Sequence, residues 1–352
     1  MSLQSISQAQ LSKSFESLPF APEDKLTAAA ATALFAELPV SCAASLAEFL
    51  DSELYYKRAC SQVAVLGCRI EEHGLSFKRL FCEVTAQELL RTTVNLSRSI
   101  AENIFTLRAC SHDFPLDQVC SQLPNLNRLD IKYGVATSSH AHARLEAVPR
   151  ALNVSTNVIS LTLQDSSIDD NDVATLFGNN SCTNNNTILN LNLGHNNITS
   201  LGLGVIVNHF IAPPTSVLSS LDMMGNRIKS EGGSVLGQGL ATNDSLLSLN
   251  LRLNSLGDDG GSALLKCIED NATLRYLNMS ANNLASRSAN ALVALLESNE
   301  SLSLETIIIT TNQFSDEDEE AIKACKQCFL DVRGGSSPVR QEMFLGKNLL
   351  PF

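Results

Sequence analysis

The sequence predicts an α/β solenoid, in which short parallel strands form the inner face and helices form the outer face. The strongest observation is a line of the form L-x-x-L-x-L-x-x-N-x-L, whose clearest copies begin at residues 188, 218, 246, 274 and 304, at intervals of 30, 28, 28 and 30 residues. A fixed period of this length is typical of repeat architectures. The composition agrees, because 44% hydrophobic residues with only 5% aromatic residues and no Trp suit a core of stacked Leu, Ile and Val.

The first half of each copy predicts a strand. Alternating apolar residues such as Leu249 and Leu251 turn one side of a short strand into the core, while the residues between them face outward on a concave surface. Two weaker copies begin at Val158 and Leu126 and lack the Asn, and a still weaker one begins at Ile104. We therefore expect seven to eight repeats within residues 101–330.

The Asn of each copy falls in the turn after the strand. Its buried amide can bond backbone groups that no strand ladder reaches, and a stacked row of such residues does this along the whole coil. The predicted Asn ladder consists of Asn196, Asn226, Asn254, Asn282 and Asn312.

The second half of each copy predicts a helix. Residues 260–269 and 289–296 both show helical spacing of apolar side chains, with Leu264, Leu265 and Ile268 in the first segment. Helices are wider than strands, so a stack of such units must curve into a horseshoe. The line is that of a leucine-rich repeat. A period of about 28 residues with a true helix resembles the ribonuclease-inhibitor type, which the activator of the Ran GTPase and the sensor domains of intracellular immune receptors share.

Charge and targeting signals narrow the class of protein. A net charge of -12 and a pI near 5.0 argue against a nucleic-acid binder, because such proteins gather Lys and Arg on one face. No apolar run approaches the roughly 20 residues that span a bilayer. The first ten residues lack the features of a secretory signal, and the ten cysteines follow no pairing pattern, which indicates buried thiols in a reducing compartment.

Four segments are expected along the chain. Residues 1–25 predict a flexible N-terminal segment, 26–100 a helical module, 101–330 the repeats, and 331–352 a C-terminal tail. We expect the repeats to end with a helix from Asp316 to about residue 329, because five acids favour a helix's N-terminal end. In the N-terminal module, the spacing predicts two amphipathic helices that pack aromatic side chains inward and hold Lys and Arg outward.

Two short motifs in this module combine basic and aromatic residues. The matching residues are Glu53, Tyr55, Tyr56, Lys57, Arg58 and Cys60 in the first motif, and His73, Gly74, Ser76, Phe77, Lys78, Arg79, Leu80 and Phe81 in the second. Placed ahead of a ribonuclease-inhibitor type repeat domain, they resemble the leucine-rich-repeat subunit of the nexin-dynein regulatory complex, also called the T-complex-associated testis-expressed family. The family pattern has Trp where this chain has Tyr56 and Phe77.

The resemblance covers residues 50–330 and implies a function. It implies a non-catalytic scaffold in the cytoplasm and cytoskeleton, at the axoneme of a cilium or flagellum, that helps regulate dynein-driven motility. The implied partners are other regulatory-complex subunits and axonemal proteins in a hetero-oligomeric assembly, with no nucleic acid and no membrane. The alternative is a small-GTPase regulator resembling the Ran GTPase activator, although that family has more repeats and a long acidic tail.

The sequence lacks the usual signatures of catalysis. It contains no phosphate-binding loop, no H-E-x-x-H and no G-x-S-x-G motif. Cys325 and Cys328 form a lone C-x-x-C pair without a nearby His, so we expect thiols and no metal site. We therefore predict that the protein is not an enzyme and uses no cofactor.

The outward strand positions map a candidate binding surface. It is polar with few charges, and its larger side chains, Met224, Arg252 and Tyr276, are the best candidates for anchors because Arg and Tyr often carry interface energy. The small residues between them leave no deep pocket for a small molecule. The predicted protein-binding residues are Arg128, Asp130, Lys132, Asn192, Asp222, Met224, Asn250, Arg252, Tyr276, Asn278 and Ile308.

Overall fold

The computed structural model describes residues 56–57, 78, 81–82, 101–102, 104–109, 116–131, 145–178, 187–298, 303–332 and 342–344. The chain divides into two compact units, of which the first comprises residues 1–108 and 118–127 and the second residues 109–117 and 128–352. The predicted segment 1–25 lies outside the described residues, as do most of the predicted module 26–100 and most of the predicted tail 331–352. The predicted site residues outside the described part of the module are Tyr55, Arg58, His73, Gly74, Phe77 and Arg79.

The described residues of the first unit confirm one feature of the predicted helical module and correct another. Tyr56 and Phe81 are both buried, with ring centroids 5.6 Å apart, and Lys57 is exposed. Lys78 was expected to face outward, but it is only 7% exposed. A long lysine stem can pack in a core when its ammonium group has a polar partner, and Lys78 is not without one.

The weakest predicted repeat also has a structural counterpart. Strand β1 spans Thr106–Ala109, and Leu107 and Ile104 are fully buried. Helix α7 spans Leu116–Ser121. Within the first unit, Asn127 N–H donates to Phe105 O at 2.9 Å and Asn125 Nδ2 donates to Glu102 O at 2.8 Å. A strand therefore lies where the sequence predicted the eighth copy.

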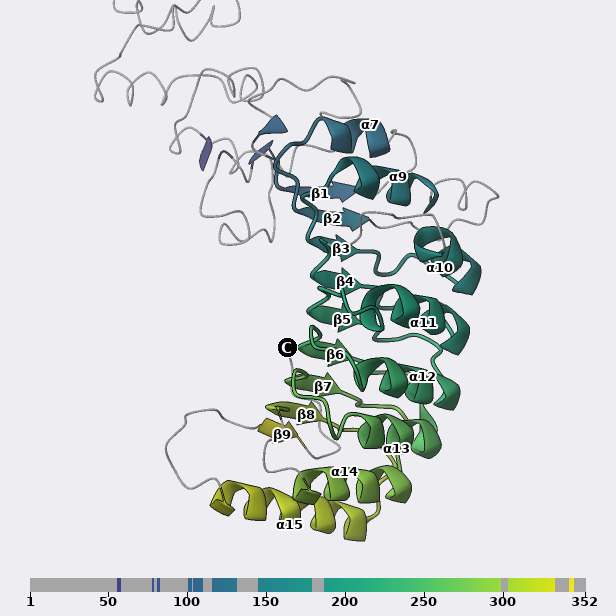
Figure 1. Ribbon diagram of the computed structural model, residues 1–352, viewed down its shortest axis with the longest axis vertical. Helices are drawn as coiled ribbons and strands as arrows, with labels where there is room; N and C mark the ends of the chain where they lie inside the picture. The colour runs from purple at the N-terminus through teal and green to yellow at the C-terminus, as the bar shows by residue number, and fades with distance from the viewer. Residues whose placement is uncertain are drawn as a thin grey trace, which may run out of the picture. The chain divides into compact units, whose positions relative to one another are not determined.

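The second unit confirms the α/β repeat fold. Its strands are all parallel and follow the order of the sequence without a shift in register (Figure 1). The strands are β2 (Arg128–Ile131), β3 (Ser160–Thr162), β4 (Asn190–Asn192), β5 (Ser220–Asp222), β6 (Ser248–Asn250), β7 (Tyr276–Asn278), β8 (Thr306–Ile308) and β9 (Glu342–Phe344).

Helices line the opposite side of this unit from the strands (Figure 1). The α-helices are α9 (Ala147–Val154), α10 (Asp170–Phe177), α11 (Ser200–Ile206), α12 (Ser230–Leu240), α13 (Gly257–Cys267), α14 (Ser286–Ser298) and α15 (Asp316–Val332). Between the two layers, the central residue of each strand from β3 to β8 is buried, as are the helix residues that face it. The core is thus the stack of aliphatic side chains that the sequence predicted.

The predicted Asn ladder holds adjacent coils together. Asn254 shows the pattern: its Oδ1 accepts a hydrogen bond from Ile228 N–H at 3.0 Å, and its Nδ2 donates to Met223 O at 3.0 Å. Both partners belong to the preceding coil, while a second donation, to Leu251 O at 3.0 Å, stays within the same coil. Asn196, Asn226, Asn282 and Asn312 make equivalent bonds.

Ser166 takes over part of this role where the Asn is missing. Its hydroxyl donates to Gln164 O at 3.1 Å and to Ile131 O, in the preceding coil, at 3.4 Å. The repeat that begins at Val158 matches the sequence pattern poorly but keeps the hydrogen bond between coils, because a hydroxyl can replace the donor half of an amide.

A second Asn ladder lies at the opposite end of the strands, and the sequence did not reveal it. Asn271 Nδ2 donates to Leu240 O at 2.7 Å, and its Oδ1 accepts from Leu274 N–H at 2.8 Å. Asn243 does the same with Ile211 O and Leu246 N–H, both at 2.8 Å. Asn243 and Asn271 are both buried and both begin an N-x-[ST]-L sequence, so this recurring motif is part of the repeat itself.

Helix α11 continues into a turn of different geometry. This turn, Val207–Ile211, is a π-helix labelled η5 in which Ala212 N–H donates to Val207 O at 2.8 Å. Burial lowers the pKa of His209 in this turn, whose ring centroid lies 4.7 Å from that of Phe210. The prolines at 213 and 214 cannot continue the helix, so the turn widens as it ends.

Removing one ladder side chain should weaken the fold. In Asn254→Ala, the buried Ile228 N–H loses its acceptor, so we expect the free energy of unfolding to fall by about 2–3 kcal/mol, measured by urea denaturation. The matched control is Asn190→Ala, an exposed position on the strand surface, which should change stability by less than ~0.5 kcal/mol. Equal effects of the two substitutions would contradict the ladder's role.

Close packing of α12 on α13 depends on glycine. A Cβ placed on Gly233 would lie 2.7 Å from the backbone carbonyl carbon of Gly260, which cannot move aside. We expect Gly233→Ala to destabilise the protein by about 1–3 kcal/mol. The control is Gly204→Ala in α11, where a Cβ meets nothing within 4 Å, so the lower backbone entropy of Ala should raise stability by about 0.5–1 kcal/mol. Thermal unfolding of both variants tests the pair.

Candidate protein-binding face

The outward side chains of β2 to β8 form a continuous surface, here called the strand face. It comprises the first and third residues of each strand and the residue two positions after each third residue. Because neighbouring strands pair in register, these side chains form rows across the sheet. One row runs Asp130, Thr162, Asn192, Asp222, Asn250, Asn278 and Ile308.

Four consecutive side chains of that row are fixed by the backbone. Oδ1 of Asn192, Asp222 and Asn250 accepts a hydrogen bond from the N–H two residues later, at 2.9, 2.9 and 3.1 Å. Asn278 does the same with Ser280 N–H at 3.0 Å. One oxygen of each group is thus committed to a local turn, which holds the side chain in a single orientation. No described residue is shown to bond the remaining polar atoms of Asn192, Asp222 and Asn250.

Asn278 departs from the prediction. It was expected to face a partner, but only 4% of it is exposed. Its Nδ2 lies 3.5 Å from the hydroxyl of Tyr276, and its Oδ1 is held by Ser280, which is also buried. At this position the larger Tyr276 covers the row, so the tyrosine side chain is what the strand face presents.

The three predicted anchors lie close to this row. Met224, Arg252 and Tyr276 are all half-buried. Met224 and Arg252 occupy neighbouring coils, since Gly225 N–H donates to Arg252 O at 2.8 Å. Among the described residues, no carboxylate forms an ion pair with Arg252. A half-buried guanidinium group with a neighbouring thioether is a suitable anchor for a protein partner.

The charges on the described part of the strand face cancel. Arg128 and Asp130 pair with each other at 3.0 Å, which leaves Asp222 and Arg252 as the other charged side chains of the described face. Ile308 is half-buried and apolar, and Lys132 lies outside the described residues. Most of the acidic residues that give the chain its charge of -12 therefore lie elsewhere. Acids occupy the first turns of α7, α10, α12, α13 and α15.

Both edges of the strand face carry exposed apolar side chains that the sequence analysis missed. Ile159, Leu189 and Leu247 are 37–41% exposed, and each stands one residue before its strand. Backbone bonds join this edge from coil to coil, for example Leu189 N–H to Ile159 O at 2.8 Å. The signal was available, because an apolar residue two positions before the central Leu recurs in these three copies.

The opposite edge is strained. The residue before each ladder Asn has a positive φ, and it is a non-glycine residue in four coils: His195, Leu253, Ala281 and Thr311. Asp165, which precedes Ser166 at the equivalent position, has a positive φ as well. Leu253, with φ of 57°, is also 43% exposed. A bulky side chain in the left-handed region costs about 1–2 kcal/mol, and such strain often accompanies binding sites. Leu253 extends the surface formed by Met224 and Arg252.

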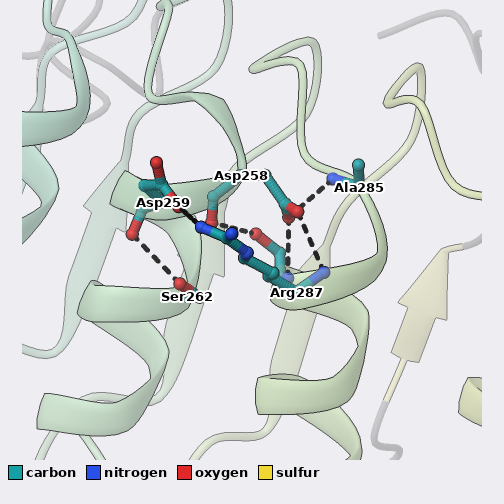
Figure 2. Close-up of polar contacts among 6 residues, drawn as sticks. Asp258, Asp259, Ser262, Ala285 and Arg287 are labelled. Atoms are coloured by element: carbon teal, nitrogen blue, oxygen red, sulfur yellow. Dashed lines mark hydrogen bonds and ion pairs between the residues drawn. The ribbon is translucent and has the colours of Figure 1, made fainter.

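A separate cluster of charged residues lies at the start of α13 and α14 (Figure 2). The carboxylate of Asp258 accepts hydrogen bonds from the backbone N–H of Ala285, Arg287 and Ser288 at 2.7–2.9 Å. Burial raises the pKa of Asp258, but these bonds favour the ionised form and together hold its pKa below the ordinary value. Beside it, the exposed Asp259 forms an ion pair with Arg287.

This cluster has a structural explanation. Asp258 belongs to the first turn of α13 and satisfies the unpaired N–H groups at the start of the next helix, α14. Asp170 of α10 acts in the same way on α11, where its Oδ1 accepts from the N–H of Thr199 at 2.8 Å and of Gly202 at 3.0 Å. Each such acid therefore caps the helix of the following repeat, which is a stabilising role for an anion.

A comparison with family models agrees with this architecture. A family model described as Leucine Rich repeat matches residues 184–207, 216–237 and 242–265. No curated protein matches the sequence. Among solved structures, the crystal structure of an internalin from Listeria monocytogenes is similar at 18% identity over 70% of this chain and 86% of that chain, with a TM-score of 0.27. So low a TM-score supports no conclusion about function.

Fold and strand face together define the class: the protein is an α/β leucine-rich-repeat solenoid. Repeats of this kind generally mediate protein–protein interaction, and the matched family model is not that of a catalytic family. Among the described residues, no group of three His, Cys, Asp or Glu side chains is arranged to hold a metal ion. In the same part of the chain, no helix has the length and hydrophobicity needed to cross a membrane.

Lowering the pH should reveal how much Asp258 contributes to the stability of the fold. Its pKa is lowered in the folded state, so its stabilisation is fully present above the unfolded value of about 3.9 and is lost as the pH falls through the lower folded value. Asp258→Ala should cost about 1–2 kcal/mol near pH 7 and reduce the dependence of stability on pH below about 4.

The neighbouring carboxylate provides the control for this experiment. Asp259→Ala removes an ion pair whose two side chains are more than 70% exposed, so stability should change by less than ~1 kcal/mol. Urea denaturation at a series of pH values distinguishes the two variants. If Asp258→Ala retained the wild-type acid dependence, the assignment of Asp258 as an inter-repeat cap would be wrong.

Proposed function

We propose that this protein is a non-catalytic scaffold subunit of the axonemal nexin-dynein regulatory complex. In this role it binds other subunits through the strand face and helps regulate dynein-driven motility of cilia or flagella. The observation that carries the binding role is the row Asn192, Asp222 and Asn250, which the backbone holds in fixed orientations beside Met224 and Arg252.

The rigidity of the strand face supports an adhesive function. Binding costs less conformational entropy when the side chains are already ordered. The face is polar and electrically balanced, with exposed apolar side chains along both edges, such as Leu189 and Leu253. A surface of this kind favours a protein partner that offers hydrogen bonds and apolar contacts over one recognised by net charge.

The assignment to the axoneme depends on the N-terminal motifs. Within them, Tyr56 and Phe81 pack against each other as aromatic core residues, which supports the interpretation that Tyr56 replaces a Trp of the family pattern without loss of packing. Lys57, in the first of these motifs, is exposed. The partners are accordingly other regulatory-complex subunits and axonemal proteins.

Rebinding to axonemes tests the role of the strand face. The purified protein is added to axonemes from cells that lack it, and the fraction bound is measured over a range of concentrations. We expect Arg252→Ala and Tyr276→Ala each to weaken binding by about 10-fold or more, as is usual for buried anchors. Arg287→Ala, on the exposed helix side, is the matched control and should bind like the wild type.

Localisation and crosslinking test the proposed assembly. A tagged copy should co-fractionate with axonemes, and its crosslinked neighbours should be regulatory-complex subunits. Normal complex composition and normal waveform after deletion of the gene, together with absence from axonemes, would overturn the proposal. The alternative, a GTPase regulator, predicts faster GTP hydrolysis by a Ran-type GTPase, whereas a scaffold leaves that rate unchanged.

A further inference from the structure

Among the described residues, the last member of the Asn ladder is Asn312, in the coil of β8. Asn312 completes the preceding coil, because its Oδ1 accepts from the N–H of Asn282 and Leu284 at 2.9 and 3.1 Å. The equivalent N–H groups of its own coil belong to Asn312 and Phe314, and no described residue accepts from them. Within the described part of the chain, the last full coil therefore has no residue in the position that Asn312 occupies for the coil before it.

A carbonyl group leads to the same conclusion. In the inner coils, one carbonyl accepts from two successive ladder residues: Leu193 O accepts from both Asn196 and Asn226, each at 2.9 Å. At the end of the ladder, Ile309 O accepts from Asn312 at 2.8 Å and from no further ladder residue within the described chain. The N–H groups of Asn312 and Phe314 and the carbonyl oxygen of Ile309 thus form a set of two donors and one acceptor that a single amide side chain can bond.

The sequence supplies a candidate beyond the last helix. Residues 340–350 read R-Q-E-M-F-L-G-K-N-L-L, which matches the repeat line at Met343, Leu345, Asn348 and Leu350 and departs from it only at Arg340. This copy begins 36 residues after the one at Leu304, a longer interval than the 28 to 30 residues between the clear copies (340 - 304 = 36). The sequence analysis assigned this segment to the C-terminal tail, residues 331–352.

The structure places the centre of this copy in the correct register. Strand β9 lies beside β8 and pairs with it in parallel (Figure 1). In this register Met343 stands opposite Ile307, just as Ile307 stands opposite Leu277. Met343 therefore occupies the position of the central core residue in every other strand. Residues 340–341 and 345–350 lie outside the described residues, so their assignment rests on the pattern.

We propose that the edge of β8 is a strand-docking surface whose occupant is this chain's own segment 340–350, which forms the strand and turn of a further coil. Asn348 then provides the amide that the ladder lacks, accepting from Asn312 and Phe314 N–H and donating to Ile309 O. Repeat proteins need such terminal caps, because an open strand edge invites pairing with other chains. A partner that binds the strand face would consequently not use the β8 edge.

Hydrogen exchange tests the contribution of Asn348. In the full-length protein, Asn348→Ala should make the amides of residues 307–314 exchange about 10-fold faster, as expected for the loss of roughly 1.4 kcal/mol of local protection. Lys347→Ala, one position away and off the ladder, is the matched control and should leave exchange unchanged. Unchanged exchange in both variants would overturn the role of Asn348.

Disulfide trapping tests the docking of the segment and the identity of the occupant. Ile308→Cys with Phe344→Cys joins register partners, whereas Ile308→Cys with Glu342→Cys does not. Under mild oxidation, we expect the first pair to form an intramolecular bond, identified by peptide mass spectrometry, several-fold faster than the second. Equal rates would overturn the register, and a disulfide-linked dimer would show that the segment comes from a second copy. Neither outcome depends on the axonemal role.

Discussion

The structure depends on one constraint: every turn that follows a strand buries backbone groups which no neighbouring strand can bond. The ladder of Asn196, Asn226, Asn254, Asn282 and Asn312 meets this constraint with one side chain per coil. Each amide joins its own coil to the preceding one, so it also fixes the vertical spacing and register of the strands. A buried N–H without an acceptor costs about 1–3 kcal/mol, which explains why a single residue type recurs at this position.

The binding surface is a consequence of that register. Because the strands do not slip, side chains at equivalent positions form rows, and the strand face becomes an ordered array. The short turns between each strand and its ladder Asn also fix the side chains of Asn192, Asp222 and Asn250. In each case, the side-chain Oδ1 accepts a hydrogen bond from a backbone N–H of the turn. Adhesion is thus built on the same turns that stabilise the coil, and the strained Leu253 lies at their rim.

On the helix side, the unbonded backbone groups lie at the helix N-termini, and charged side chains bond them. The first turn of a helix leaves N–H groups unpaired, and acids such as Asp258 and Asp170 bond those of the following helix. This arrangement gathers negative charge at helix N-termini, where the macrodipole favours it. The net charge of -12 is therefore compatible with a neutral strand face. Acidic residues here contribute to repeat stacking, and they do not define the surface that we propose for partners.

The sequence by itself determined the period, the strand and helix positions, the ladder residues and the rows of the strand face, because each depends on local spacing. Only the tertiary structure decided which side chains a neighbouring coil covers or bonds. Asn278 lies under Tyr276, Lys78 is buried, and Asp258 caps a helix some 27 residues away. The β9 strand was also missed, since Arg340 obscures the pattern until β8 provides an edge to pair with. Contacts between coils join residues far apart in the chain, and a local pattern contains no information about them.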